Sequence, residues 1–537
     1  MKKIITGLMF FSALNFVTCT VSFSKPPTLV VLLVVDQMRP DLLTRFDDLY
    51  KGGFRWLMDN GIWFTNTHHE HSYTATGPGH TAIGFGQHPG KVGLIGNSFY
   101  DRNLKKNVNC VEDPKAKIIG SNRGLARSAR RYDAKGLGDW IKLEYPSSKI
   151  ISIGGKDRAA CLLGGKNPDQ AIYYNNLGEF VSSDYYVNQL PLWATKFNNE
   201  LKTRSYGDSL WQRSLHEALY NEYAREDYFY GEEDNYNYNQ YSPVFPIGTD
   251  LEDDPLAILM SKPWFEREVL LLSKYAVLDD SLGLDDAPDL LSIGLSAMDW
   301  IIHSYGPFSQ EAMDAFIKLD TYLGTFIEFL DDYVGLENVL FALTADHGGL
   351  PLPEYLQDQG QKAGRIVNDH FEEALTWIDE ESEEKFGKKF YHREGGNFFL
   401  NRAEIKESNI QPEKVYEIIS KYMTKVEGIE RMVIKENILS GKDTTKINQR
   451  LMNMIHSDLT PEIFPIVSPN YLFRGPFGTS HGSPYDYDTH VPLIFSRKGF
   501  RAKQKTQPFA TVDIAPTIAK YLIMDVPAYC DGKGFDL

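Results

Sequence analysis

Long apolar runs rich in β-branched residues recur along the chain and predict strands. They cover residues 28–35, 150–153, 290–295 and 339–344. Runs without polar alternation are typical of strands that are buried on both faces of a parallel sheet. Residues 312–333, in contrast, place apolar side chains at helical spacing, from Phe316 to Leu330. The pattern therefore predicts an α/β fold, with a mostly parallel central sheet flanked by helices.

Polar residues of chemical interest follow each predicted strand. Asp36 follows the first strand, two glycines the second, Asp299 the third and Asp346 the fourth. Open α/β sheets bind their ligands beyond the carboxyl ends of the strands. We therefore expect these groups to converge at one edge of a single sheet.

Two long stretches lack such units, and we predict that they are a cap and an α+β insertion. The first, about residues 165–285, is rich in tyrosine and asparagine, most densely over 228–238. We expect a solvated surface there, rather than a strip that binds carbohydrate or aromatic groups. The second stretch is about residues 353–475. Its predicted elements are an acidic helix near 372–384, a helix over 413–426 and a strand near 432–434.

The N-terminus has the residue order of a signal peptide. Two lysines precede an apolar segment that ends at Val17, and the small serines at 22 and 24 offer a cleavage point. We expect residues 1–24 to be removed and residues 25–537 to form a periplasmic or secreted catalytic domain. A lipoprotein is the less favoured alternative, because the residues before Cys19 make a poor lipobox. A helix that crosses a membrane needs a stretch of about 18 or more apolar residues, and the chain has no such stretch after the N-terminus.

The charge balance excludes partners that need a positive surface. The chain has 56 Lys and Arg against 72 Asp and Glu, and loss of residues 1–24 would change the formal charge from −16 to −18. Nucleic acid and anionic lipid are therefore not expected as main partners. A small anionic substrate stays compatible with locally fixed cations, and we expect the protein to be a monomer.

Cys110, Cys161 and Cys530 would remain in the mature chain. One disulfide with one free thiol, or three buried thiols, are both compatible with this odd number. None has the close spacing of a cysteine zinc site, so we assign these residues no chemistry.

Two pairs of a carboxylate and an imidazole have the spacing of metal ligands. Asp299 and His303 are four residues apart, which puts both on one face of a helix, although such a pair alone is more often a surface feature. Asp346 and His347 are more specific, because they end a predicted buried strand and the glycines that follow allow close approach of the backbone. Solvent-facing loop residues are the alternative for this second pair.

Other histidines are weaker candidates for metal binding. We favour His481, which precedes a glycine, over His490 in the same segment. The run His68-His69-Glu70-His71 is expected to be structural or at the surface, because adjacent histidines on a strand point to opposite faces.

Thr76 lies among glycines and a proline, in a turn that leads into a predicted helix. A threonine at this position is usually a helix N-cap, but the unpaired N–H groups of a helix N-terminus also favour an oxyanion. A nucleophilic role would require a metal ion to lower the pKa of the hydroxyl. Lys156 and Arg158 follow Gly154-Gly155, in a segment that lacks the first glycine and the serine or threonine of a P-loop. We expect these two cations to bind a phosphoryl group, the alternative being a solvent-facing basic pair.

Several short motifs stand in a fixed order along nearly all of the mature chain. They are Val34-Val35-Asp36-Gln37-Met38-Arg39, Ala75-Thr76-Gly77-Pro78-Gly79-His80, Ile95-Gly96-Asn97-Ser98-Phe99-Tyr100-Asp101, Lys156-Asp157-Arg158, Asp299 to His303, Thr344-Ala345-Asp346-His347-Gly348 and His481-Gly482. This combination resembles the alkaline phosphatase superfamily. It is most similar to the phosphate-irrepressible bacterial alkaline phosphatases, which are related to nucleotide pyrophosphatase/phosphodiesterases.

The resemblance implies two zinc ions and a phosphothreonine intermediate. One zinc ion would be held by Asp299, His303 and His481, and the other by Asp36, Asp346, His347 and the nucleophile Thr76. Asn97, Lys156 and Arg158 would bind the nonbridging phosphoryl oxygens.

Within this resemblance, the cations at 156 and 158 favour hydrolysis of phosphate monoesters, whose transferred group carries one more negative charge than that of a diester. A phosphodiesterase or nucleotide pyrophosphatase on the same core is the alternative. A sulfatase is excluded because threonine cannot become formylglycine. A zinc-stabilised binding protein, with Thr76 as a mere helix cap, is the alternative without catalysis.

Overall fold

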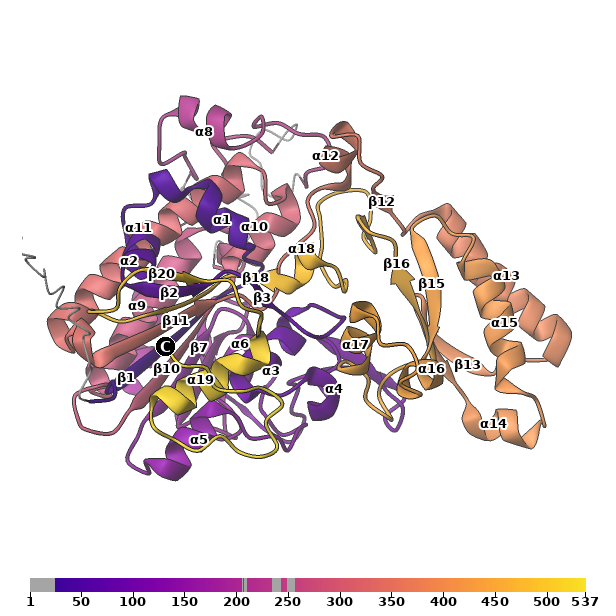
Figure 1. The fold of residues 1–537 in the computed structure, drawn as a ribbon, viewed down its shortest axis with the longest axis horizontal. Coiled ribbons are helices and arrows are strands. Elements are labelled where there is room, and N and C mark those ends of the chain that lie inside the picture. Colours follow the sequence, from indigo (N-terminus) through magenta and orange to yellow (C-terminus); the bar gives the residue numbers. More distant parts are fainter. Residues whose placement is uncertain (1–24, 205, 207–209, 234–242, 249–255) are drawn as a thin grey trace, which may run out of the picture.

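The computed structural model describes residues 25–204, 206, 210–233, 243–248 and 256–537. A ten-stranded sheet forms the centre of the molecule (Figure 1). Its strands, in spatial order, are β20 (Lys503–Lys505), β2 (Gly61–Phe64), β19 (Leu493–Ser496), β11 (Val339–Thr344), β1 (Leu29–Val35), β10 (Asp289–Leu295), β7 (Ile150–Gly154), β8 (Gln170–Tyr174), β9 (Phe180–Ser183) and β6 (Ile118–Ile119). The predicted signal peptide and residues 234–238 of the tyrosine-rich stretch lie outside the described residues.

The four predicted strands are confirmed as β1, β7, β10 and β11, each within one residue of the expected bounds. From β11 through β1, β10 and β7 to β8, neighbouring strands are parallel, whereas β19 and β9 add antiparallel neighbours on either side. The α/β class and the mostly parallel sheet predicted from the apolar runs are therefore correct.

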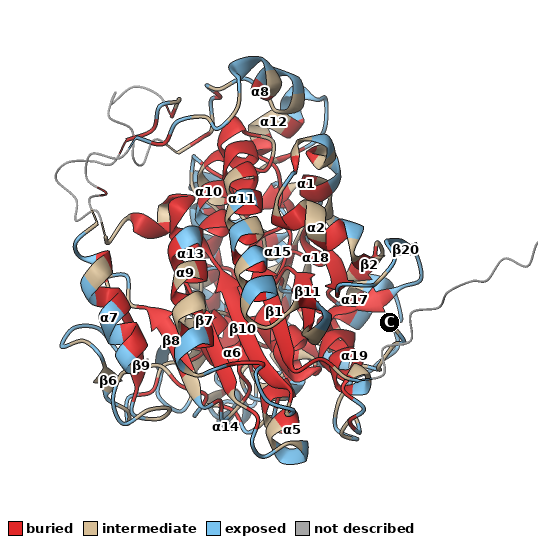
Figure 2. Ribbon diagram, turned by 90° about the vertical axis from the view of Figure 1, so that its left-hand side faces the viewer, coloured by how far each residue is buried: buried red, intermediate tan, exposed pale blue. Residues whose placement is uncertain are grey.

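Helices cover both faces of the sheet, which explains why its strands show no polar alternation (Figure 2). Leu29, Val31, Leu33 and Val35 of β1 face one core, and the residues between them face the other. The first core is covered by α1 (Pro40–Arg45), α2 (Gly53–Asp59), α7 (Leu192–Leu201), α8 (Glu217–Tyr223), α9 (Trp264–Asp279), α10 (Ala297–Tyr305) and α11 (Gln310–Tyr333). The second is covered by α3 (Thr76–Phe85), α5 (Leu137–Glu144), α6 (Asp157–Leu163) and α19 (Ile514–Tyr521).

Strand register aligns the carboxyl ends that carry the candidate residues. Val35 pairs with Leu295 across β1 and β10, and Val34 pairs with Thr344 across β1 and β11. The backbone N–H of Asp36 continues this ladder and donates to the carbonyl of Leu295 at 2.8 Å. The sheet thus brings the residues after all three strands to one edge, as expected for a binding site in an open α/β fold.

The predicted cap over residues 165–285 needs correction at both ends. Its first part supplies β8 and β9 to the central sheet, and its last part supplies α9, which packs on the first core. The tyrosine content of β8 concealed this role: Tyr173 and Tyr174 are buried, and their hydroxyls are satisfied by the N–H of Arg127 and the carbonyl of Leu256. Between these parts, Tyr228 and Tyr230 are half exposed, as expected of a solvated surface.

Residues 353–475 contribute an α+β unit at the right of Figure 1, with a core of its own. Its four-stranded sheet has the order β13 (Tyr391–Glu394), β14 (Asn397–Leu400), β16 (Ile463–Val467) and β15 (Ile429–Ile434). The predicted acidic helix is α13 (Asp369–Phe386), and the predicted second helix is α15 (Pro412–Met423). Shorter elements are α12 (Pro353–Asp358), β12 (Gly364–Arg365), α14 (Arg402–Glu407), α16 (Lys435–Leu439), α17 (Lys446–Met452) and β17 (Tyr471–Leu472). We call residues 353–475 the insertion.

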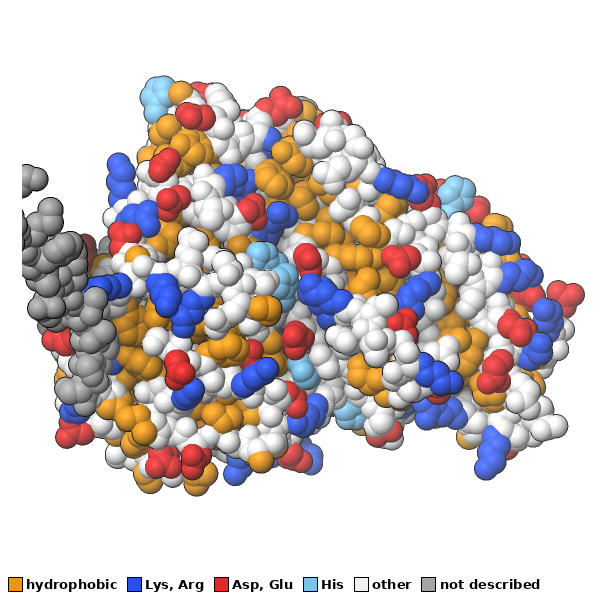
Figure 3. Space-filling model, in the orientation of Figure 1, with side chains coloured by type: hydrophobic (Ala, Val, Ile, Leu, Met, Phe, Trp, Pro, Cys, Tyr) orange, Lys and Arg blue, Asp and Glu red, His pale blue; other side chains and the backbone are white. Residues whose placement is uncertain are grey.

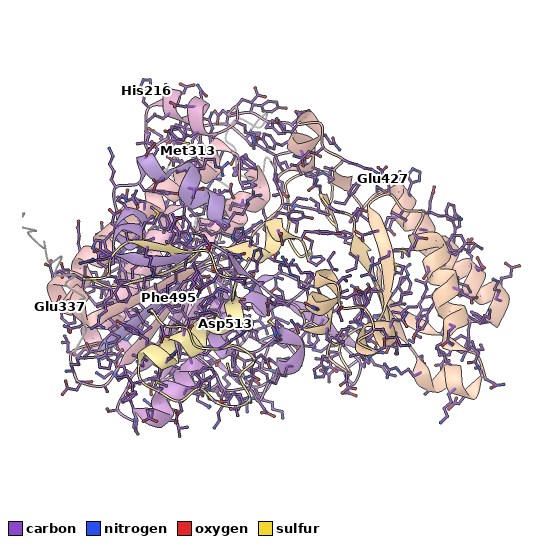
Figure 4. All side chains as sticks on the ribbon, in the orientation of Figure 1. His216, Met313, Glu337, Glu427, Phe495 and Asp513 are labelled. Atoms are coloured by element: carbon purple, nitrogen blue, oxygen red, sulfur yellow. The ribbon has the colours of Figure 1, made fainter. Side chains whose placement is uncertain are left out.

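Small connecting elements complete the fold. They are β3 (Thr67–His68), α4 (Pro89–Val92), β4 (Ser98–Asp101), β5 (Lys106–Asn109), α18 (Asp486–Thr489), β18 (His490–Val491) and β21 (Phe509–Ala510). Asp513, labelled in Figure 4, lies directly before α19 and accepts hydrogen bonds from the N–H groups of Ala510 and Lys533. Among the described residues, Cys110, Cys161 and Cys530 are free thiols. The helices in the described part of the chain are all too short or too polar to span a bilayer.

Candidate metal centre

The first cluster joins two helical residues to a distant loop residue. Asp299 and His303 lie one turn apart on α10, and the Nε2 atom of His303 is 3.3 Å from an oxygen of Asp299. His481 approaches the same oxygen, with its Nε2 atom at 3.6 Å. The ligand atoms of all three residues lie within 4.8 Å of one another, so they could hold a single ion.

The second cluster lies at the ends of β1 and β11. The Nε2 atom of His347 is 3.5 Å from Asp36 and 3.6 Å from Asp346, and all three side chains are buried. Their ligand atoms also lie within 4.8 Å of one another. The two clusters adjoin, because the imidazoles of His347 and His481 stack with their centroids 3.6 Å apart.

Hydrogen bonds orient the three histidines as metal ligands. The Nδ1 atoms of His303 and His481 each lie 2.6 Å from a backbone carbonyl, and that of His347 lies 2.9 Å from one. A carbonyl only accepts, so Nδ1 carries the proton and Nε2 presents its lone pair. The Nε2 atom of His347 and the Oδ1 atom of Asp36 are buried without a hydrogen-bond partner. These donors fit a divalent ion that accepts nitrogen and oxygen ligands.

The electrostatics of the centre keep the imidazoles of His347 and His481 neutral. Burial lowers the pKa of His481 well below its usual value, and the neighbouring His347 lowers it further. Burial also lowers the pKa of His347, although Asp346 attracts its proton. A neutral imidazole is the form that binds a metal. Burial raises the pKa of Asp36, with repulsion from Asp346 as a second cause.

Lys156 connects the two clusters. It is the N-cap of α6, and its buried ammonium lies 2.7 Å from an oxygen of Asp36 and 2.5 Å from one of Asp299. Burial lowers the pKa of Lys156, but attraction to Asp299 and Asp36 outweighs this, so the pKa is raised and the residue stays charged. The same ammonium overcomes the effect of burial on Asp299, whose pKa is well below the usual range.

Thr76 is the first residue of α3, and the N-cap position before it is Ala75, whose side chain forms no cap hydrogen bond. Thr76 is buried, and its carbonyl accepts a hydrogen bond from Nδ1 of His80 at 2.8 Å. That imidazole also lies 3.3 Å from Asp346 in the second cluster. Gly79 lets α3 approach the backbone of Asp346 closely, because a Cβ atom at Gly79 would lie 1.9 Å from the carbonyl oxygen of Asp346. The N-terminus of α3 therefore packs directly on the second cluster.

Asn97 and Arg158 lie around these groups. The side-chain oxygen of Asn97 accepts a hydrogen bond from the N–H of Gly77 at 2.7 Å, in the first turn of α3. Arg158 lies in the first turn of α6, where its guanidinium contacts Asp157 at 3.1 Å. Lys156 and Arg158 line one cavity of about 270 Å³. The two cations are thus presented by a helix N-terminus, and not by an extended strand end.

Two residues of the centre were missed by sequence reasoning. Gln37 is buried with φ near 60°, its N–H donates to Asp346 at 3.1 Å, and its amide nitrogen, turned toward Asp299, donates to that carboxylate at 2.9 Å. It therefore contacts both clusters. Glu266 accepts hydrogen bonds from the N–H groups of Ser296 and Ala297, so it caps the helix that carries Asp299. The position of Gln37 beside Asp36 was a usable signal, whereas Glu266 stood in the stretch predicted to be a solvated cap.

The histidine-rich run stays apart from both clusters. His69 and His71 are buried with their rings in contact, and His68 stacks on His490 with centroids 4.6 Å apart. In the described part of the chain, neither cluster includes any of these four residues. His481 is the histidine of its segment that lies in the first cluster.

The chain is similar to proteins named alkaline phosphatase along nearly its whole length. The chain is 29% identical to alkaline phosphatase PafA of Elizabethkingia meningoseptica, over 99% of this chain and 98% of that protein. It is 29% identical to alkaline phosphatase PhoV of Synechococcus elongatus, over 94% and 92% of the two chains. The crystal structure of wild-type PafA superposes with a TM-score of 0.87 at 29% identity, covering 95% of this chain and 98% of that one.

A more distant solved structure shares the fold. Murine ectonucleotide pyrophosphatase/phosphodiesterase 5 superposes with a TM-score of 0.51 at 13% identity, over 94% of this chain and 97% of that one. The sequence profile of type I phosphodiesterase / nucleotide pyrophosphatase matches residues 30–490, which is most of the chain. The protein is therefore a member of the type I phosphodiesterase / nucleotide pyrophosphatase family.

Proposed function

We propose that the protein is an alkaline phosphatase that binds two zinc ions and hydrolyses phosphate monoesters. One ion would be held by Asp299, His303 and His481. The other would be held by Asp36, Asp346, His347 and Thr76. The relatives named alkaline phosphatase, which align along nearly the whole chain, support this activity. When bound, the ions would lower the pKa of a hydroxyl group and neutralise charge on the reacting oxygens.

The proposed reaction has two steps. The hydroxyl proton of Thr76 passes to solvent as its Oγ1 atom forms a bond to phosphorus and the bond from phosphorus to the ester oxygen breaks. The alcohol leaves with a proton from solvent. Water then cleaves the phosphothreonine and releases inorganic phosphate. The N–H groups at the start of α3 favour the anionic phosphoryl group at this place. Asn97, Lys156 and Arg158 would bind its nonbridging oxygens.

One observation carries the choice of monoesters: the ammonium of Lys156 lies buried between the two clusters, with Arg158 on the same cavity. A monoester dianion gains more from two fixed cations than a diester monoanion does. The family description favours a phosphodiesterase as the second candidate. Such an enzyme would use the same clusters but would gain less from Lys156 and Arg158.

The test is hydrolysis of 4-nitrophenyl phosphate and of methyl 4-nitrophenyl phosphate by the purified protein. We expect the monoester to be preferred, the activity to disappear with a chelator, and zinc to restore it. Activity that persists in chelator, or none after zinc is restored, would refute the metal-dependent reaction. A preference for the diester would identify the second candidate.

We also propose that the enzyme is exported and acts as a monomer in the periplasm or medium. The basic and apolar N-terminal segment supports export. N-terminal sequencing of the mature protein should begin at or near Lys25, and light scattering should give the mass of one chain. A chain that retains Met1, or a lipid on Cys19, would contradict this proposal.

A further inference from the structure

A cleft of about 650 Å³ opens between the sheet domain and the insertion, beside the first metal cluster. His481 lines it together with Tyr73 and Phe99 from the sheet domain, and Phe371, Tyr471 and Phe473 from the insertion. Figure 3 shows hydrophobic side chains gathered at the surface where the two parts meet. The cleft is large enough for an organic group of the size that protein pockets commonly bind.

Apolar side chains are exposed within this cleft. Tyr73 is 45% exposed, Val367 44% and Phe473 40%, although most large apolar residues of the protein are buried. The ring of Phe473 packs edge to face against Phe371, with centroids 5.7 Å apart. Exposed apolar surface that lines a groove is typical of a ligand-binding site.

The charge of the lining excludes an anionic occupant. Among the described residues that line the cleft there is no lysine or arginine, and its carboxylates are Glu394 and Asp488. The cavity that contains Lys156 and Arg158 is separate and also includes Arg127. The phosphoryl group and the aromatic cleft therefore occupy environments of opposite character.

The cleft lies on the side of the metal centre where the leaving ester oxygen is expected. Thr76 and its helix pack on the second cluster, whereas the cleft begins at His481 in the first cluster. In an in-line displacement, the attacking and leaving oxygens lie on opposite sides of phosphorus. The leaving group of a phosphoryl group bound at Thr76 would thus project toward His481 and into the cleft.

Tyr73 stands at this exit. A Cβ atom at Gly482 would lie 3.1 Å from the ring of Tyr73, and one at Gly96 would lie 3.6 Å from it. The ring therefore lies between the backbones of Gly96, which precedes Asn97 in the chain, and Gly482, which follows His481. One face of the exit from the metal centre is an aromatic ring.

We propose that this cleft binds the leaving group and selects phosphate monoesters of uncharged aromatic or apolar alcohols. The inference rests on the proposed phosphomonoesterase activity. Tyr73 and Phe473 act as specificity-determining residues that contact the organic group, and the chemistry at phosphorus stays with the metal centre.

The test compares 2-phenylethyl phosphate with ethyl phosphate, whose leaving alcohols have similar acidity, and adds 2-carboxyethyl phosphate as an anionic probe. We expect kcat/KM for the phenylethyl ester to exceed that for the ethyl ester by about 10-fold or more. Tyr73→Ala and Phe473→Ala should each lower this ratio by about 3- to 10-fold, the usual worth of one aromatic contact. Tyr73→Phe should retain the ratio, and the carboxyethyl ester should be the poorest substrate.

Trp377→Ala is the matched control, because Trp377 is an aromatic residue of the insertion that is 44% exposed but does not line the cleft. It should leave all rates unchanged. Hydrolysis of all three esters with a ratio near one, or ratios unaffected by both alanine variants, would overturn the cleft proposal and leave the phosphatase intact. Absence of hydrolysis of every monoester with zinc present would instead overturn the phosphatase itself.

Discussion

Lys156→Met tests the centre most directly, because the substitution removes a buried ammonium that contacts a carboxylate of each cluster. Asp36, Asp299 and Asp346 are all buried, so the metal-free variant would hold three carboxylates without this cation. Breaking a buried ion pair by removing one partner costs about 3–5 kcal/mol. Bound divalent ions would supply compensating charge, so the cost with zinc should be smaller, on the order of 1 kcal/mol.

Two measurements follow from this charge balance. Thermal unfolding should show a large decrease in melting temperature for Lys156→Met in chelator and a small one in zinc. For catalysis, loss of one preorganised charged donor lowers the rate by about 10²- to 10³-fold. We expect this loss in kcat/KM for 4-nitrophenyl phosphate, and about 10-fold or less for the methyl diester, whose transferred group carries less charge.

Lys435→Met is the matched control. Lys435 is also buried, with its ammonium 3.0 Å from the carbonyls of Ser457 and Thr460 and 3.5 Å from Glu462. Its loss should lower the melting temperature by the same amount with and without zinc, and should not change the ratio of monoester to diester rates. Equal rate losses for both esters in Lys156→Met would refute the assignment of this lysine to the phosphoryl group.

Three further substitutions probe other parts of the centre. Thr76→Ala should abolish turnover, while metal analysis should still find two zinc ions per chain. Turnover above about 1% of the wild-type rate would show that Thr76 is not the nucleophile. Gly79→Ala should lower both zinc content and melting temperature, because its Cβ atom would lie 1.9 Å from the carbonyl oxygen of Asp346, and wild-type values would show that α3 can shift. Burial raises the pKa of Glu266 to about 8, whereas its pKa in the unfolded chain is about 4.3. Between these two pH values the folded state binds one proton more than the unfolded state does. The free energy of unfolding therefore falls as pH rises through this range. Urea unfolding between pH 5 and 9 should show this slope reduced in Glu266→Gln, and an unchanged slope would contradict it.

The sheet and the candidate ligands at its edge could be predicted from sequence, because strands buried on both faces have runs of apolar residues without polar alternation. β1 consists of apolar residues only, and β11 is apolar up to its last residue, Thr344. Asp36 follows β1 directly, and Asp346 follows β11 after one residue. Parallel register then aligns these ends without further information. The family motif added His481, which lies 182 positions beyond Asp299 and which spacing alone could not have joined to it.

Contacts made by long side chains could not be predicted in the same way. The ammonium of Lys156 reaches Asp299 across 143 positions, and nothing local in the chain distinguishes this lysine from a solvated one. The tyrosines of β8 looked polar because sequence does not show which hydroxyls find buried acceptors. Glu266 shares this difficulty, since its partners are backbone N–H groups at the start of α10, which any sequence could supply.

The proposed preference for monoesters and the proposed preference for a leaving alcohol depend on different parts of the chain. Mutations should therefore change one preference without the other. Lys156 and Arg158 lie at the N-terminus of α6 in the sheet domain, and their proposed role is to favour monoesters over diesters by charge. Phe371, Tyr471 and Phe473 belong to the insertion and line the cleft that we propose for the leaving group. Because the two groups of residues line different cavities, changes in the insertion should alter which alcohol is preferred without changing the preference for monoesters. The insertion can thus vary in sequence and change substrate choice while the metal centre stays the same.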